Sequence, residues 1–446
     1  MRVFFSNLGC KLNQAELEHL ARQFRATGHA IASSLAEADL HVVNSCTVTH
    51  VAARDSRKLA RRGRRLNPAI RTVLTGCYST AAPEEAKDLT GVDLIVPNDL
   101  KDRLVEHVHQ AFPEPGRALG VSGSLPVPFV PLEFGNSRAL VKVEDGCNMR
   151  CSFCVIPLTR GRQHSRPMDE VVSEVEALGR GGFQEVVITG VQISSYRDGA
   201  NGLFELVETI LAKTVVARIR LTSIAPWQLD HRLLDLFSTG RLCRHFHLSL
   251  QSGCAHTLTR MRRPYTPQEY AEQVCVLRER LPGVAITTDL IVGFPGESDG
   301  DFDKSLDFCK AMSFARVHAF PFSPRPGTEA ATLPEQVPHS VVRERMTRAL
   351  TVADASERRY WNQNLGTSAD VLWESRRQGR WFGTTDNYIR VHTDSDVDLA
   401  NFLGPARLET ITEEGVGCEL GSSTPIEPPS LSFAAEDGGP VSLPSS

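Results

Sequence analysis

Three cysteines lie close together in the segment from Glu144 to Cys154, at positions Cys147, Cys151 and Cys154. The spacing C-x3-C-x2-C lets three thiolates bind three corners of a four-iron cluster and leaves the fourth iron without a protein ligand. A structural zinc site would need a fourth cysteine or histidine at similarly short range, and none occurs before His164. The segment therefore predicts an iron–sulfur loop with one iron open for chemistry.

This spacing resembles that of the radical S-adenosylmethionine (SAM) enzymes, and Phe153, the aromatic residue before the last cysteine, fits the same family. In that family the open iron binds the amino and carboxylate groups of SAM. The resemblance implies a [4Fe-4S] cluster with SAM as cofactor, and catalysis centred on Cys147, Cys151 and Cys154.

The length of 446 residues exceeds one hydrophobic core and predicts two or three domains. Hydrophobic residues make up 41% and charged residues 23%, and no apolar run approaches the roughly 20 residues of a membrane span. The N-terminus lacks a signal-peptide pattern, so we expect a cytoplasmic protein with no membrane partner. Eleven cysteines in that compartment favour metal binding or catalysis over disulfides. The net charge of −4 excludes no class of partner.

Residues 1–112 alternate short apolar strands with helical patterns, which predicts a flavodoxin-like α/β domain with a parallel sheet. Cys10, Cys46 and Cys77 each follow one of the first three predicted strands. Ligands of open parallel sheets collect at the carboxyl ends of the strands, so we expect these thiols to converge. The alternative is three buried cysteines that pack as small apolar residues. The residues beside these cysteines are Gly, Asn and Ser and not an apolar run. This favours a second site at which the thiols act as ligands.

The predicted helix from about Thr49 to Leu66 is strongly basic and carries one acidic residue, Asp55. A charge run is usually a solvated face, but the density and single sign here favour a surface that binds phosphates. Several of its basic residues recur at helical spacing and form one ridge, and the candidates for RNA contact are Arg54, Arg57, Lys58, Arg61 and Arg65.

Proline and glycine recur over 113–131 and predict an interdomain linker. Six predicted strands with intervening helices follow in 132–338, which indicates a partial (βα)6 barrel with its site at the carboxyl ends of the strands. Strict alternation over 245–251 places four polar residues on one face, and we expect this row to line the cavity: His245, His247, Ser249 and Gln251. Glycine-containing turns end two other strands and are expected to approach the cofactor, through Thr189, Gly190, Gly293 and Gly296.

A connecting helix is predicted over 339–365, and short alternating strands over 366–420 indicate a small antiparallel β-barrel. The tail at 421–446 is rich in Pro, Ser and Gly and is predicted to be disordered. Five arginines occur beside ten acidic residues in 366–420, an unusual balance for an RNA-binding module. RNA contact there is expected from arginine and aromatic side chains, namely Arg376, Arg377, Arg380, Trp381, Tyr388 and Arg390.

From residue 1 to about 420 the chain is similar to the methylthiotransferases. This radical SAM family has an N-terminal cluster domain, a central radical domain and a C-terminal TRAM barrel that binds RNA. The resemblance rests on the central cysteine triplet and three N-terminal cysteines, and it implies that Cys10, Cys46 and Cys77 bind an auxiliary [4Fe-4S] cluster. The motifs at 9–14, 76–78 and 320–328 resemble the branch that acts on N6-threonylcarbamoyladenosine in tRNA. Neighbouring branches act on isopentenyladenosine in tRNA or on a ribosomal-protein aspartate.

The implied reaction adds a methylthio group to C2 of the adenosine immediately 3′ of the anticodon, position 37. That C–H bond is neither acidic nor electrophilic, so a SAM-derived radical must break it. The adenosine lies in a single-stranded loop, where bases can be splayed out and read. Arg160 and Arg325, in loops near the predicted mouth, are candidates to bind the threonylcarbamoyl carboxylate. The implied partners are the tRNA anticodon stem-loop and a cytosolic electron donor, and we expect a monomer.

A protein of another class would need the same cysteines: an iron–sulfur module that binds RNA or senses redox state without turnover. Such a module would not need a polar cavity large enough for SAM. Cleavage of SAM by the reduced protein therefore separates the two hypotheses.

Overall fold

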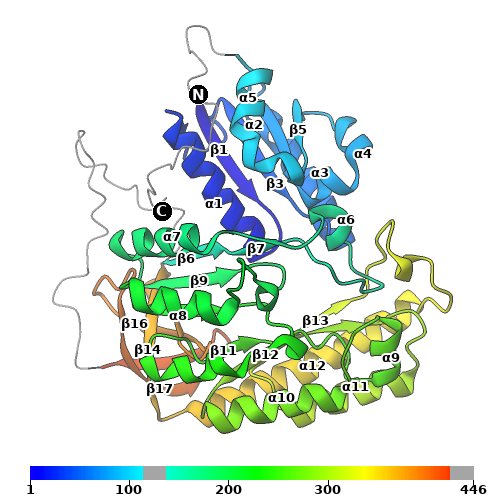
Figure 1. Cartoon of the computed structure of the whole chain (residues 1–446), viewed down its shortest axis with the longest axis vertical. Coiled ribbons are helices and arrows are strands. Elements are labelled where there is room, and N and C mark those ends of the chain that lie inside the picture. Colours follow the sequence, from blue (N-terminus) through cyan, green and yellow to red (C-terminus); the bar gives the residue numbers. More distant parts are fainter. Residues whose placement is uncertain (114–136, 422–446) are drawn as a thin grey trace.

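The computed structural model describes residues 1–113 and 137–421. Figure 1 shows an N-terminal domain (blue to cyan) above a central domain (green to yellow), with a small β-barrel (orange) beside the lower part of the central domain. Nearly all of the predicted linker and of the predicted disordered tail lie outside the described residues.

Five parallel strands form the N-terminal sheet in the order β2-β1-β3-β4-β5, one of the two common orders of doubly wound sheets. Helices α1 and α5 pack on one face, in a core with Val3 and Val42, and α2 and α3 pack on the other, in a core with Val43. The strands are β1 (Arg2–Asn7), β2 (Ala30–Ile31), β3 (Leu40–Ser45), β4 (Arg71–Gly76) and β5 (Leu94–Val96). The helices are α1 (Lys11–Ala26), α2 (His50–Leu66), α3 (Cys77–Ala81), α4 (Pro83–Lys87), η1 (Asn98–Arg103) and α5 (Leu104–Ala111).

Six parallel strands form the central sheet in two halves, β10-β9-β6 and β11-β12-β13, as the sequence predicted. Parallel bridges from Ile219 to Leu242 and from Ile224 to Leu248 join the halves. The strands are β6 (Arg138–Lys142), β9 (Glu185–Thr189), β10 (Arg218–Leu221), β11 (His245–His247), β12 (Ala285–Val292) and β13 (Arg316–Pro321), with a short pair β7 (Glu144–Asp145) and β8 (His164–Ser165).

Helices cover the outer face of the central sheet, and local sequence signals begin several of them. Capping boxes start α10, at Thr266 with Glu269, and α11, at Ser298 with Asp301. The helices are α6 (Ile156–Arg160), α7 (Met168–Arg180), η2 (Ile193–Ser195), α8 (Leu203–Lys213), η3 (Pro226–Gln228), η4 (His231–Thr239), α9 (Ala255–Arg260), α10 (Pro267–Arg280), α11 (Asp299–Met312) and η5 (Glu329–Ala331).

The connecting helix α12 spans His339–Asn364, and it links two cores: Ala349 and Ala353 pack in the central domain, while Tyr360 packs against the small barrel. Like the other described helices, α12 is not long and apolar enough to cross a membrane. Five strands then close a barrel in the order β14-β15-β16-β18-β17, antiparallel as predicted except for the parallel pair β16 and β18. They are β14 (Ser368–Arg377), β15 (Arg380–Thr385), β16 (Arg390–Asp394), β17 (Leu403–Ile411) and β18 (Val416–Leu420).

The small barrel covers the amino-terminal ends of the central strands. Glu185, the first residue of β9, is fully buried and accepts hydrogen bonds from Arg218 Nε at 2.6 Å and Arg220 Nε at 2.7 Å. The same two arginines donate to barrel carbonyl oxygens within residues 384–386. The barrel therefore lies at the opposite end of the central strands from the loop that carries the three central cysteines.

Candidate active site at the junction of two domains

The cysteines of the N-terminal domain lie at the carboxyl ends of three neighbouring strands. Cys10 follows β1, Cys46 follows β3, and Cys77 follows β4 at the start of α3. Gly9, with φ of +107°, permits the close approach, because a Cβ at this position would lie 2.9 Å from the Cys46 sulfur. Strands β3 and β4 pair at Ser45 and Gly76, the residues directly before Cys46 and Cys77. The three cysteines thus lie together at one edge of the sheet, as the strand order predicts.

The central cysteines lie on the loop between β7 and α6, and this loop adjoins the N-terminal set. Helix α6 begins two residues after Cys154 and packs against α3, which begins at Cys77. Asn98 connects the same two regions: its Nδ2 donates to the Thr159 carbonyl at 2.7 Å and lies 3.7 Å from the Cys77 sulfur. The two cysteine sets therefore occupy adjoining loops of two domains.

Burial keeps several of these thiols protonated in the absence of a cation. It raises the pKa of Cys46 to about 11 and that of Cys154 to about 12, and neighbouring thiols of each set contribute. Metal binding is what converts such thiols to thiolates. Within residues 1–113 and 137–421, no three His, Cys, Asp or Glu side chains are grouped to share one metal ion. Each cysteine set offers three free thiols, which are the ligands that iron–sulfur clusters use, and each thiol would bind a separate iron.

Arg263 contacts the central set, and the sequence analysis missed it. Its Nη1 donates to the Cys151 sulfur at 3.3 Å, and its guanidinium lies 4.7 Å from the Trp227 ring centroid and 5.2 Å from that of Tyr265. No local motif marks this arginine, because its partner lies 112 positions away. It brings positive charge and a hydrogen-bond donor to the central cysteines.

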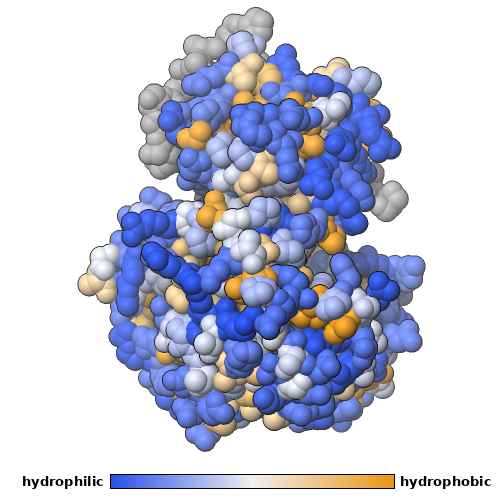
Figure 2. Space-filling model, turned by 90° about the vertical axis from the view of Figure 1, so that its right-hand side faces the viewer, coloured by the Kyte–Doolittle hydropathy of each residue, from blue (hydrophilic) through white to orange (hydrophobic). Residues whose placement is uncertain are grey.

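A cavity of about 310 Å³ opens between the two domains. Val48 and Thr49, just after Cys46, line it from the N-terminal domain, and all three central cysteines line it from the other side. Its volume lies at the lower end of the roughly 300–1,000 Å³ of small-molecule sites. The other described lining residues are Met149, Phe153, Val155, Ile156, Val191, Gln192, Ser223, Ala225, Trp227, His247, Ser249, Gln251, Arg263, Asp289, Ile291, Phe320, Pro321, Phe322 and Ser323. On the face shown in Figure 2 the surface is mostly hydrophilic, with apolar residues (orange) near the junction of the two lobes.

Three residues expected at the cofactor, Phe153, Ser249 and Gln251, line this cavity. Thr189, Gly190, Gly293 and Gly296 do not belong to its described lining, contrary to expectation. A side chain of another element lies beside each of these glycines: Glu144 beside Gly190, Val342 beside Gly293 and Arg260 beside Gly296. These glycines allow close packing within the protein.

Asp289 and His247 form a polar part of the cavity wall. His247 Nε2 and Asp289 Oδ2 are 3.2 Å apart, and the Thr287 hydroxyl lies 3.0 Å from His247 Nδ1. Although burial acts against it, the hydrogen bond from His247 and the charges of both nearby histidines lower the pKa of Asp289. Asp289 is thus an anion on β12, where its neighbours Leu290, Ile291 and Val292 are apolar. Sequence periodicity gave no signal for it.

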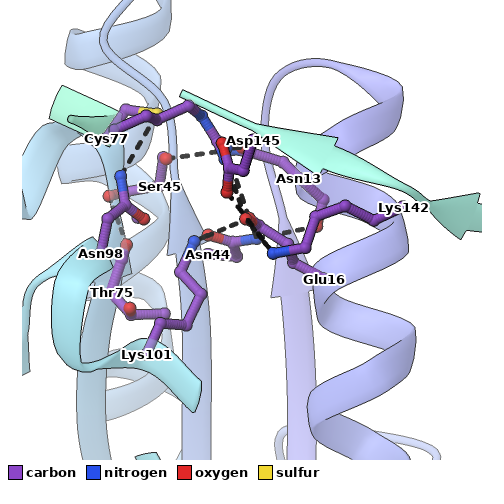
Figure 3. A network of polar contacts seen from close by, with 12 residues as sticks. Asn13, Glu16, Asn44, Ser45, Thr75, Cys77, Asn98, Lys101, Lys142 and Asp145 are labelled. Atoms are coloured by element: carbon purple, nitrogen blue, oxygen red, sulfur yellow. Dashed lines mark hydrogen bonds and ion pairs between the residues drawn. The ribbon is translucent and has the colours of Figure 1, made fainter. Parts of the chain in front are cut away.

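A buried network around Glu16 of α1 joins the N-terminal and central domains (Figure 3). The Glu16 carboxylate accepts from Lys101 Nζ at 2.7 Å and from Arg160 Nη1 at 2.8 Å, and Lys142 Nζ lies 3.4 Å away. Arg160 also donates to Asp145 at 2.9 Å. Although burial opposes it, the three cations hold the pKa of Glu16 well below its usual range. The network thus keeps a charged cluster inside the interface.

The expectation that Arg160 binds the substrate carboxylate is wrong. Its side chain is 1% exposed, its Nη1 is used by Glu16 and Asp145, and its Nη2 donates to Asn13 Oδ1 at 2.5 Å. Arg325, the other candidate, is also buried, and it contacts Thr47 of the N-terminal domain. Arg160 therefore holds the domains together.

The small barrel offers less to RNA than the sequence predicted. Trp381 is buried in the barrel core, and Tyr388 stacks on His245 with ring centroids 4.1 Å apart, so neither ring is free to stack on a base. The same stacking takes His245 out of the cavity wall. Arg376 pairs with Asp396, and Arg380 pairs with Asp394 and Glu414. Arg377 and Arg390 are exposed, over the Phe382 ring.

The basic ridge on α2 begins at the cavity, because Thr49 both caps the helix and lines the cavity. Arg54 and Lys58 share Asp55, Arg57 lies over the Tyr78 ring, and Arg64 pairs with Asp93. Three exposed arginines form no ion pair within the described part of the chain: Arg61, Arg62 and Arg65. This helix therefore presents more free positive charge than the barrel does.

Comparison with known proteins defines the class. The chain matches the family model of the radical SAM superfamily over residues 141–309 and that of an uncharacterized protein family, UPF0004, over residues 2–97. Its fold resembles the structure of the radical SAM methyltransferase TsrM from Kitasatospora setae, with a TM-score of 0.55 and 16% identity over 74% of this chain and 75% of that one. The central domain is therefore that of a radical SAM protein.

Curated relatives narrow the class. A threonylcarbamoyladenosine tRNA methylthiotransferase, MtaB, of Bacillus subtilis is 33% identical over 87% of this chain and 89% of its own length. The MtaB of Aquifex aeolicus is 36% identical, over 90% and 99%. The tRNA-2-methylthio-N(6)-dimethylallyladenosine synthase of Maricaulis maris is 30% identical, over 95% and 98%. The chain belongs to the radical SAM methylthiotransferase family.

Replacing Cys147, Cys151 and Cys154 together by Ala is expected to halve the iron of the anaerobically reconstituted protein, from about eight irons per chain to about four. Iron and sulfide analysis measures this change. The exposed Cys275, changed to Ser, serves as the control and should keep the full content. A folded triple variant that retained all its iron, or lost all of it, would refute the two-site assignment. The other cysteines predicted not to be ligands are Cys243, Cys254, Cys309 and Cys418.

Changing Glu16 to Gln is expected to lower the free energy of unfolding by about 3–5 kcal/mol, because it leaves three buried cations facing one remaining carboxylate. Denaturant unfolding followed by tryptophan fluorescence measures the effect. The matched control is Glu106→Gln, which breaks an exposed pair with Arg103 and should leave the midpoint unchanged. Equal midpoints for the two variants would show that the network does not stabilise the interface.

Proposed function

We propose that this protein is a tRNA methylthiotransferase that converts N6-threonylcarbamoyladenosine at position 37 to its 2-methylthio derivative. The observation that carries the proposal is an interdomain cavity lined on one side by the three central cysteines and on the other by Val48 and Thr49, which closely follow Cys46 of the N-terminal set. Sulfur insertion needs a centre that breaks the C–H bond and a source of sulfur, both within reach of the same carbon. A cluster on the central set in the cavity wall and a second cluster on the adjoining N-terminal loops would meet that requirement.

The chain would hold one [4Fe-4S] cluster on each cysteine set. When bound, the clusters and SAM supply the radical and the sulfur, which ordinary acid–base side chains cannot provide. Phe153 offers an apolar face to a purine ring, and Trp227, which stacks on Tyr265 and lies beside Arg263, helps to close the wall against water. Ser249, Gln251 and Asp289 offer the hydrogen-bonding groups that orient a polar ligand.

The threonylcarbamoyl branch is supported by relatives of that name, which are 33–36% identical to the chain. Relatives named for dimethylallyladenosine, which is the isopentenyladenosine named above, are 30–33% identical to the chain. This nucleoside is therefore the alternative substrate. An isopentenyl group would need an apolar slot, and the cavity does have an apolar wall: Met149, Phe153, Val155, Ile156, Phe320 and Phe322. Nucleoside analysis separates the two branches.

The tRNA would dock along α2, with its target adenosine entering the cavity where that helix begins. The barrel, which we propose to be a TRAM domain, would add contacts through Arg377 and Arg390. We place the reaction in the cytoplasm, catalysed by a monomer that takes electrons from a cytosolic donor. The competing hypothesis, an iron–sulfur module without turnover, requires that the reduced protein does not cleave SAM.

Deleting the gene is expected to remove 2-methylthio-N6-threonylcarbamoyladenosine from tRNA and to leave the unmethylthiolated nucleoside to accumulate. The cause is the loss of the sulfur-inserting step alone. Mass spectrometry of tRNA nucleosides measures both species, and methylthio-isopentenyladenosine serves as the internal control. Loss of the isopentenyl product, or of a methylthiolated ribosomal-protein aspartate, would refute the assignment to the threonylcarbamoyladenosine branch. The assignment to the methylthiotransferase family would stand.

Changing Arg61 and Arg65 to Gln is expected to weaken tRNA binding and to reduce the slope of log affinity against log salt by about one for each phosphate that is no longer neutralised. The matched variant changes Arg376 and Arg380, which are already paired with carboxylates, and should have the smaller effect. Binding measured at several salt concentrations gives both slopes. If the variant changed at Arg376 and Arg380 lost more tRNA affinity, the main RNA-binding surface would lie on the barrel and not on α2.

A further inference from the structure

Arg325 reaches from the central domain to the N-terminal cysteine set. It lies on the loop after β13, is 7% exposed, and donates from Nη2 to the Thr47 hydroxyl at 2.5 Å. Thr47 directly follows Cys46. An arginine of one domain is therefore buried against the cysteine loop of the other.

The remaining donors of Arg325 lack a protein acceptor. Nε and Nη1 are both buried, and neither has a hydrogen-bond partner within residues 1–113 and 137–421. A buried polar group left without a partner costs about 1–3 kcal/mol, so two such donors on one cation call for an acceptor. Arg160, by contrast, uses both its terminal nitrogens on protein oxygens. The two buried arginines therefore differ: Arg325 has two hydrogen-bond donors without an acceptor, whereas both terminal nitrogens of Arg160 are paired.

The backbone around Arg325 is held in place. Pro324 and Pro326 flank it, and its carbonyl accepts from Thr328 N at 3.1 Å and from the Thr328 hydroxyl at 2.7 Å. Proline fixes its own φ and restricts the residue before it. The turn therefore fixes the direction from which the side chain approaches the cysteine set.

Two charged side chains outside the cysteine set act on Arg325: Arg57 has the same charge and Glu85 the opposite charge. Neither takes up the buried donors, because Nε and Nη1 of Arg325 have no hydrogen-bond partner within the described residues. An acceptor for these donors is therefore still required beside the Cys46 loop.

We propose that Arg325 donates hydrogen bonds from Nε and Nη1 to a sulfur anion of the auxiliary cluster and so positions that cluster for sulfur transfer. The inference rests on the proposed function, which places a cluster on Cys10, Cys46 and Cys77. It replaces the expectation that Arg325 binds the threonylcarbamoyl carboxylate. The central set gives a precedent within the same chain, because Arg263 donates to the Cys151 sulfur.

Hydrogen bonds to cluster sulfurs stabilise the reduced, more negative state. In a full-length background with Cys147, Cys151 and Cys154 changed to Ala, the auxiliary cluster titrates alone. Arg325→Gln is expected to shift its reduction potential to a more negative value, measured by a redox titration followed by electron paramagnetic resonance. Arg325→Lys keeps the charge but loses the fork of donors, so its potential should fall between the other two.

Arg57→Gln is the matched control, because it removes a positive charge near Arg325 without removing the buried donors. Its shift should be smaller than that of Arg325→Gln. An equal shift in the two variants, or an unchanged potential in Arg325→Gln and Arg325→Lys at full cluster content, would overturn the proposal. A folded Arg325→Gln variant that fails to hold the cluster would support the contact if Arg325→Lys restores the iron, and would overturn it if Arg325→Lys does not.

The same variants separate this inference from the proposed function. A role for Arg325 at the substrate carboxylate predicts an unchanged potential and weaker binding of tRNA that carries threonylcarbamoyladenosine, relative to tRNA with unmodified adenosine. That pair of results would refute the contact with the cluster. The wild-type protein could also fail to methylthiolate tRNA while Arg325→Gln still shifts the reduction potential. That result would refute the proposed function, but the contact between Arg325 and the cluster would stand.

Discussion

The ion-pair network centred on Glu16 is the interaction on which the site depends. Three cations, Lys101, Lys142 and Arg160, surround two carboxylates, those of Glu16 and Asp145, inside the domain interface. The free energy of a buried charge depends strongly on its position, because the charge is tolerated only with an opposite charge at short range. A network of this kind holds the two domains in one register, and that register places Val48 and Thr49, just after Cys46, opposite the central cysteines across one cavity.

The two ends of the central strands have different roles. On β12, Ala285 packs in the core of the small barrel, whereas Asp289 and Ile291, a few residues further on, line the cavity. The barrel thus closes the amino-terminal end, and the cavity opens at the carboxyl-terminal end, where loops can vary without disturbing the sheet. Helix α2, with the arginines that are unpaired among the described residues, begins at this cavity, because Thr49 caps the helix and lines the cavity.

Each cysteine set has an arginine supplied by a distant part of the chain, half-buried in the case of Arg263 and buried in the case of Arg325. Arg263 contacts Cys151, and Arg325 lies beside the loop of Cys46. Burying negative charge is costly, so a guanidinium at each set would offset part of that cost if the set held a cluster on three thiolates. The arrangement ties the electrostatics of both sites to the packing of the domains.

The sequence alone determined what depends on neighbours along the chain. It provided the cysteine triplet on one loop, the six parallel strands, and α12 with its bounds, because ligand spacing and hydrophobic periodicity are local. Tertiary structure decided the roles of Arg160, Trp381, Tyr388 and His245, which the sequence placed at the substrate, at RNA or in the cavity wall. Their partners lie across interfaces between distant segments, and Arg160 and Glu16 are 144 positions apart. Whether an arginine is free or paired depends on the segments that pack against it, and sequence periodicity does not predict those contacts.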